Sequence, residues 1–291
     1  MRIYLRYFIF IFSVLLLTSS VVESSASTSP KRKLIITGTG AGIGAMRRMA
    51  EGFQKKHPNV AIDVLPSIGS TGAIKAVKEG RIDIGLSSRP LTPEERSMGI
   101  IEEPYGRTPF IFAVQESNPT KGVTLTEIEG IYAGKRKTWP DGTPIRLILR
   151  PLRDSFSVYL ASINSRFKSA SEKAHSIPGV FVGTTDQEAA EQTEKTPGSF
   201  GTTSSSLMAV EKRRIKALSV DGAAPVPSNI ADGVHVSAGN KYPFTMTMSL
   251  VYKGDTDKGA VKDFIKFVFS KDGRKLLSES GHVTLPRITG K

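Results

Sequence analysis

The chain has 291 residues, no cysteine and a formal net charge of +13, and 39% of its residues are hydrophobic and 23% charged. This composition is typical of a globular protein that is large enough for one big domain or two lobes. The lack of cysteine excludes disulfides, thiolate metal sites and a cysteine nucleophile. The excess of basic residues favours anionic partners, but the charge alone does not specify which kind.

The N-terminal stretch has the layout of a secretory signal peptide. Arg2 and Arg6 precede the apolar run YFIFIFSVLLL, and small and polar residues follow it. The run is short for a membrane span, so we predict that residues 1–26 are removed on export to the periplasm, with an uncleaved anchor as the alternative. Because no cysteine follows the run, a lipid anchor is excluded. Residues 27–32 are expected to form a basic linker.

The first folded segment, LIITGTGAGIGAM at residues 34–46, has the pattern of a strand, a glycine-rich turn and a helix that begins near Ala45. The turn also matches the T-G-x-x-x-G-I-G pattern of short-chain dehydrogenases. Export argues against a nicotinamide cofactor, and Tyr132 is followed by Arg136 where that family needs a lysine. We therefore expect the turn to lie beside a small anion and predict no cofactor.

Strand and helix patterns then alternate along the chain. The expected strands are residues 33–38, 60–66, 82–88, 108–117, 144–151, 216–222 and 244–253. The expected helices are residues 44–58, 69–81, 92–99, 124–134 and 154–167, with two more inside 258–281. This alternation predicts an α/β fold with a mostly parallel sheet covered by helices. Residues 221–243, rich in Pro, Gly and Asn, predict an irregular crossing segment.

Several predicted helices begin with residues suited to capping. Ser70 or Thr71 is the expected N-cap of the helix at 69–81. Thr92 is expected to cap the helix at 92–99, with Pro93 in its first turn and Glu95 completing a capping box. Capping is the ordinary structural role of Ser70 and Thr71, and it competes with a role in ligand binding.

The same succession of strand, small-residue turn and helix occurs in TGTGAGIG, PSIGSTG and RPLRDSFS. Each helix start presents unpaired backbone N–H groups that attract an anion. Arg150 ends an apolar strand, where a charge is costly unless it is paired. The alternatives for Arg150 are a ligand contact, a salt bridge with Asp154 or a surface position. Ser88 ends the third predicted strand, at the edge where ligands bind in open α/β sheets. Arg153, in contrast to Arg150, is expected to be solvated.

Other chemistries have little support in the sequence. The four histidines lack metal-ligand spacing, and no G-x-S-x-G or P-loop motif occurs. The basic run EKRRIK at residues 211–216 has no interleaved aromatics, so we expect a solvated face and no nucleic acid. Trp139 is expected to pack in a turn. We therefore predict no catalytic residue, no metal and no enzymatic activity.

Five segments, in this order and spacing, resemble the periplasmic phosphate-binding proteins of ABC importers. They are residues 49–95, 124–150, 197–208, 217–230 and 263–286. The resemblance implies a two-lobed type II periplasmic binding protein fold with mixed, mostly parallel sheets flanked by helices. Residues 33–112 and 246–291 are expected to form one lobe and residues 113–245 the other, with the ligand in the cleft between them. It also implies a monomer that serves a membrane-embedded ABC permease.

The resemblance places the ligand contacts on specific positions of this chain. The implied ligand-binding residues are Gly42, Ile43, Ser70, Thr71, Ser88, Arg150, Asp154, Ser155 and Ser157. This chain departs from the family where Gly42 replaces a frequent threonine, Ser88 an aspartate of some members, and Phe156 a glycine. These departures leave open whether the ligand is phosphate, sulfate, molybdate or tungstate. The alternative is a secreted interaction protein of the same fold with a degraded pocket.

Overall fold

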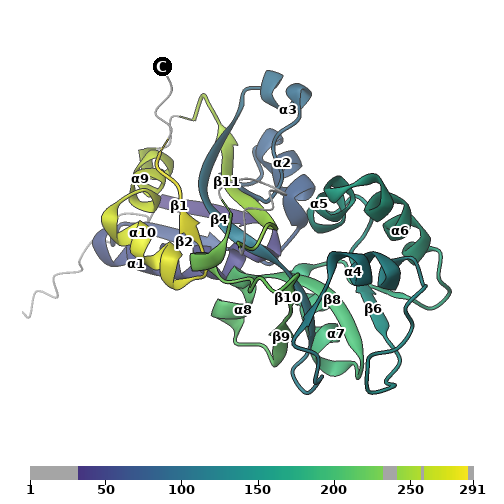
Figure 1. Cartoon of the computed structure of the whole chain (residues 1–291). Helices are drawn as coiled ribbons and strands as arrows, with labels where there is room; N and C mark the ends of the chain where they lie inside the picture. Colours follow the sequence, from purple (N-terminus) through teal and green to yellow (C-terminus); the bar gives the residue numbers. More distant parts are fainter. Residues whose placement is uncertain (1–31, 232–240, 257–258, 288–291) are drawn as a thin grey trace, which may run out of the picture. The chain divides into compact units, whose positions relative to one another are not determined.

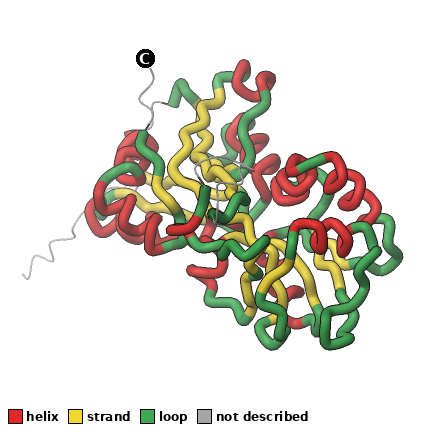
Figure 2. The backbone as a smooth tube through the Cα atoms, in the orientation of Figure 1, coloured by secondary structure: helices red, strands yellow, loops and turns green. Residues whose placement is uncertain are grey.

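Figure 1 shows a computed structural model of the chain, which describes residues 32–231, 241–256 and 259–287. The strands are β1 (Arg32–Gly38), β2 (Val60–Val64), β3 (Ile84–Ser87), β4 (Ile100–Gln115), β5 (Gly122–Val123), β6 (Arg146–Leu149), β7 (Phe181–Val182), β8 (Ser199–Ser204), β9 (Ile215–Ala217), β10 (Ser219–Val220), β11 (Thr245–Lys253) and β12 (Val283–Thr284). The helices are α1 (Gly40–Lys56), α2 (Gly69–Lys78), α3 (Pro93–Ser97), α4 (Leu125–Tyr132), α5 (Ser155–Ile163), α6 (Ser165–His175), α7 (Asp186–Lys195), α8 (Ser205–Glu211), α9 (Gly259–Val268) and α10 (Lys271–Glu279), with a 3-10 turn at Pro227–Asn229. Helices and strands alternate along much of the tube in Figure 2.

The N-terminal strands form a parallel group. β1 pairs in parallel with β2 on one side and β3 on the other, and β11 pairs antiparallel with β3. Strands that are connected through helices adopt this parallel arrangement because the crossover helix must return along the sheet. Leu34 and Ile36 of β1 are fully buried, as parallel strands covered by helices require.

Helix α1 packs its apolar face inward, as the sequence predicts. Met46, Met49, Ala50 and Phe53 are buried, which follows their helical spacing. The ring of Phe53 meets the edge of Phe264 of α9 at a centroid distance of 5.4 Å. Figure 1 shows α9 and α10 beside α1, and their expected positions in the sequence are confirmed.

Strand β4 is long and changes its partners along its length. Its residues Ile100–Pro109 pair with β11, whereas Phe110–Ala113 pair with β8. The hydrogen-bonded path continues from β8 to β6 and β7, and these last pairings are parallel. The result is a mixed α/β architecture, which confirms the predicted fold class.

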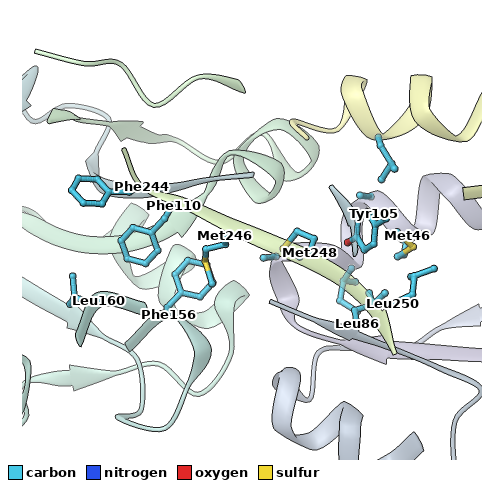
Figure 3. Packing of buried hydrophobic residues seen from close by; sticks show 14 of the residues in the cluster. Met46, Leu86, Tyr105, Phe110, Phe156, Leu160, Phe244, Met246, Met248 and Leu250 are labelled. Carbon is cyan, nitrogen blue, oxygen red and sulfur yellow. The ribbon is translucent and has the colours of Figure 1, made fainter. Parts of the chain in front are cut away.

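Aromatic and sulfur-containing side chains pack along β4 and β11. Figure 3 shows Met248 and Leu250 of β11 on the side of Tyr105, and Met246 on the side of Phe110 and Phe156. The rings of Phe110 and Phe156 lie 5.4 Å apart between centroids. Burial of such side chains contributes about 1.5–3 kcal/mol each relative to exposure, so this core fixes the two long strands against their neighbours.

Three local predictions are wrong. The first helix begins at Gly40 rather than near Ala45, because the glycine-rich segment itself winds into the first turns. The second helix has Ile68 at its N-cap position and no side-chain cap, so Ser70 and Thr71 lie inside the first turn. The predicted helix at 154–167 is two helices, since Asn164 adopts an extended backbone and caps the second one.

Other local predictions are confirmed. Thr92 and Glu95 form the expected capping box, with Pro93 in the first turn. Trp139 is 1% exposed and donates a hydrogen bond from its indole N–H to the Gly198 carbonyl. Within the described residues, no helix has the length and apolar character needed to cross a membrane. The predicted signal peptide and residues 232–240 of the segment 221–243 lie outside the described residues.

Candidate functional site

The N-termini of four helices meet in one buried region. Thr39 precedes α1, Ser70 lies in the first turn of α2, and Ser155 and Asp186 are the first residues of α5 and α7. Ser88 follows strand β3 and joins them. Each helix N-terminus carries about half a positive charge on its unpaired N–H groups, so their convergence creates a region that favours negative charge.

Four hydroxyl groups from these separate turns are in contact. The Oγ of Ser88 lies 2.7 Å from Ser155 Oγ, 3.1 Å from Thr39 Oγ1 and 3.3 Å from Ser70 Oγ. The backbone N–H of Ser88 also donates to Ser70 Oγ at 3.0 Å. All four side chains are buried. Ser70 therefore contributes its hydroxyl to this cluster and not to helix capping.

Arg150 lies beside this cluster at the end of β6 and is 3% exposed. Its Nη2 atom lies 2.9 Å from Asp154 Oδ2 and 3.5 Å from Asp186 Oδ1, and its Nη1 donates to the Gly183 carbonyl at 2.5 Å. Its Nε is buried with no hydrogen-bond partner among the described residues. The two Nη atoms of the guanidinium are thus paired, whereas its Nε–H is a buried donor without an acceptor. Such an unpaired donor is costly in a protein interior unless a further acceptor binds there.

Asp186 connects Arg150 to the start of α1. Its Oδ2 accepts hydrogen bonds from the Ala41 N–H at 3.1 Å and from Thr39 Oγ1 at 3.5 Å. Burial raises the pKa of Asp186 to about 6, and the charge of Asp154 adds to this increase, while Arg150 and the α1 N–H groups oppose it. A carboxyl group with this pKa changes its protonation state near pH 6.

Gly40 permits this contact. A Cβ atom at Gly40 would lie 2.5 Å from Asp186 Oδ2, well inside van der Waals distance. The glycine at position 40 therefore allows a carboxylate oxygen to reach the N-terminus of α1.

The other predicted binding residues have different surroundings. Gly42 and Ile43 are buried in the first turns of α1, and the Gly42 N–H already donates to the Thr39 carbonyl. Thr71 is exposed and accepts from Arg89 at 3.4 Å. The Ser157 hydroxyl donates to the Arg150 carbonyl at 2.9 Å, so it holds the backbone of the arginine in place. The structure thus brings together Ser70, Ser88, Arg150, Asp154 and Ser155 of the predicted set.

Sequence reasoning missed Thr39 and Asp186. Thr39 lies within the opening turn TGTGAGIG, where we singled out the glycine positions that follow it. Asp186 begins the helix after GTT at residues 183–185, a further strand–turn–helix unit in which Thr185 is the N-cap. That unit follows a strand of only two residues, β7, so its strand signal was weak.

Two further groups of charged side chains bear on other chemistries. Within the described ranges, no group of three or more His, Asp or Glu side chains is arranged to hold a metal ion. In the basic run at 211–216, Arg213 pairs with Glu211 and Glu194, and Arg214 pairs with Glu194. These pairs partly neutralise the run.

The chain matches the profile of a known protein family. A family profile described as "PBP superfamily domain" matches residues 23–272. The chain therefore belongs to the PBP superfamily, which agrees with the resemblance identified in its sequence.

Individual relatives carry more specific names than the superfamily. Phosphate-binding protein PstS 2 of Streptococcus pneumoniae serotype 4 is 35% identical over 107 residues, which are 37% of this chain and 36% of that protein. The match thus spans about a third of that relative. Phosphate-binding protein PstS of Bacillus subtilis is 26% identical over 270 residues, 90% of this chain and 82% of that protein.

Solved structures share the fold. A putative phosphate ABC transporter substrate-binding protein with bound phosphate from Clostridium perfringens has a TM-score of 0.75 and 23% identity, covering 87% of this chain and all of that one. A high-affinity periplasmic phosphate-binding protein, PfluDING, has a TM-score of 0.68 and 13% identity over 87% of this chain and 91% of that one. The predicted type II periplasmic binding protein fold is confirmed.

Proposed function

We propose that this chain is an extracytoplasmic solute-binding protein that captures phosphate, or a related tetrahedral oxyanion, for an ABC importer. One observation carries the proposal: hydroxyls from four separate turns converge beside a buried arginine that retains an unpaired donor. A dehydrated tetrahedral anion needs such donors from several directions. The relatives named as phosphate-binding proteins support the same ligand class.

In this proposal Ser70, Ser88, Ser155 and Thr39 donate hydroxyl hydrogen bonds to the anion oxygens. Arg150 supplies charge-assisted hydrogen bonds, which are about twice as strong as neutral ones. The converging helix N-termini contribute roughly 0.3–1 kcal/mol each, and up to about 2 kcal/mol where they are partly buried. Gly42, Ile43, Thr71, Asp154 and Ser157 keep their predicted place at or near the ligand as part of the proposal.

We also propose that residues 33–112 and 246–291 form one lobe and residues 113–245 the other. The change of β4 partners between Pro109 and Phe110 supports a boundary near this point. The protein would be exported with loss of residues 1–26, act as a periplasmic monomer, and deliver its ligand to a membrane-embedded permease.

A second candidate is a secreted interaction protein of the same fold that no longer binds an anion. The pairing of Arg150 with two carboxylates favours it, because these carboxylates already compensate the positive charge. Calorimetric titration of the purified protein with phosphate, sulfate, molybdate and tungstate separates the two. We expect saturable binding of at least one anion at a single site. Absence of heat and of thermal stabilisation with all four would favour the interaction protein.

A further inference from the structure

The candidate site contains one cation and two carboxylates in close contact. The side chains of Arg150, Asp154 and Asp186 are 2%, 11% and 5% exposed. With both carboxylates ionised, the three groups together carry a single negative charge. Adding an oxyanion to a buried region that is already negative is opposed by like-charge repulsion and by desolvation. An anion therefore binds more tightly when one of the negative charges is removed.

Asp186 is the carboxylate that competes most directly with an incoming anion. Its Oδ2 uses the Ala41 N–H and the Thr39 hydroxyl, and its Oδ1 faces Arg150. These are donors that an oxyanion would need. Asp154, in contrast, accepts from the Phe156 N–H at 3.0 Å as the N-cap of α5 and from Arg150 Nη2 at 2.9 Å, so donors from its own helix and from the arginine both hold it.

The remaining groups around Asp186 do not replace it. On its own helix, Glu188 accepts from the backbone and hydroxyl of Thr184, and these hydrogen bonds lower the pKa of Glu188. Gln187 donates to the Gly40 carbonyl and to Glu211 at the end of α8. From β6 and the start of α5, the charged groups that face Asp186 are Arg150 and Asp154.

We propose that oxyanion binding at this site is coupled to the uptake of one proton, which neutralises Asp186. This inference rests on the proposed function and specifies its ligand: the site binds an oxyanion together with a proton. The proton balance is simple, because the solvent supplies one proton, Asp186 becomes a neutral carboxylic acid, and the anion takes over the contact with Arg150. Neutral Asp186 then has a hydroxyl that can donate to an anion oxygen.

Since burial places the pKa of Asp186 near 6, the proton is absent from the free protein at alkaline pH. Binding at a pH above this value then loses about tenfold in affinity for each pH unit. At pH 5 the carboxyl is already protonated, and the linkage disappears.

The test is isothermal titration calorimetry with sulfate and with phosphate at pH 5 and pH 8, each in two buffers of different ionisation enthalpy. The buffer dependence of the heat gives the number of protons taken up. Sulfate is the cleaner probe because it remains fully ionised over this range. Asp186→Asn removes the titrating group and keeps an oxygen that can accept from Ala41. Glu188→Gln is the matched control, since it removes the next carboxylate on the same helix.

For wild type and for Glu188→Gln we expect about one proton per sulfate at pH 8, and about 100-fold weaker sulfate binding at pH 8 than at pH 5. For Asp186→Asn we expect no proton uptake and similar affinity at both pH values. Sulfate binding by wild type without proton uptake at pH 8 overturns the inference, and so does proton uptake that persists in Asp186→Asn. If neither protein binds either anion at either pH while circular dichroism shows both folded, the proposed function itself fails.

Discussion

Truncation of Arg150 to alanine is the most direct test of the proposed site. The side chain is 2% exposed, its Nη2 contacts two carboxylates, and its Nε is a buried donor with no partner among the described residues. Removing it takes away charge-assisted hydrogen bonds to the anion and leaves Asp154 and Asp186 without their cation. Loss of a buried paired charge costs on the order of 2–5 kcal/mol. Oxyanion affinity is therefore expected to fall between about 30-fold and several thousand-fold.

Two further variants separate charge from geometry. Arg150→Lys keeps the positive charge, but an ammonium cannot make the planar, two-pronged contact of a guanidinium, so we expect only partial recovery of affinity. Arg153→Ala removes a neighbouring arginine that is exposed, and we expect little change. Calorimetry on the three variants with the same anion gives the comparison, and circular dichroism with thermal melts shows that each is folded.

The result that refutes the reasoning is specific. If Arg150→Ala is folded and binds the anion as tightly as wild type, then the assigned site is wrong. The hydroxyl cluster of Ser70, Ser88 and Ser155 would then be a structural network, and the glycine-rich opening turn would have no claim to an anion.

Other properties of the chain can be tested independently. Burial lowers the pKa of His282 to about 4, so as pH falls from about 6.5 the unfolded chain binds a proton before the folded protein does, and stability is lost. Urea unfolding at pH 7 and pH 4.5 should therefore show that wild type loses roughly 2–3 kcal/mol more than His282→Gln. Equal losses would contradict this. Thr92→Ala removes an observed helix cap and should lower the free energy of unfolding by about 1 kcal/mol. Thr71→Ala, at a predicted cap that is not used, should lower it by less than about 0.5 kcal/mol. Equal effects of the two variants in thermal melts would refute the cap assignment. Mass spectrometry of the periplasmic fraction should show a mature start after Ala26, while intact protein in membrane pellets would indicate an anchor.

Periodicity was sufficient to predict the class of fold. The apolar spacing of Met46, Met49, Ala50 and Phe53 fixes one face of a helix, and short apolar runs such as the one around Ile36 fix buried strands. These are local signals, because the position of a side chain on a helix or strand depends on its own segment. The order of the segments then identified the family before any contact was known.

Local signals failed where the turn chemistry was ambiguous. The sequence placed the start of the first helix near Ala45, since glycines usually disfavour helix interiors. In the structure the helix begins at Gly40, and this position needs a glycine because a Cβ atom there would lie 2.5 Å from Asp186 Oδ2. The requirement comes from a residue 146 positions away in the sequence (Gly40 to Asp186), so no local rule could reveal it.

The candidate site was predicted in part for the same reason. Ser70, Ser88 and Arg150 lie where a strand gives way to a helix, and the sequence alone marked those positions. The contacts of Ser88 with Thr39 and Ser155, and of Asp186 with Arg150, depend on which strands are adjacent. Strand order and register are set by the packing of the whole chain, so only the tertiary structure decided which polar groups share one buried region and what charge that region carries.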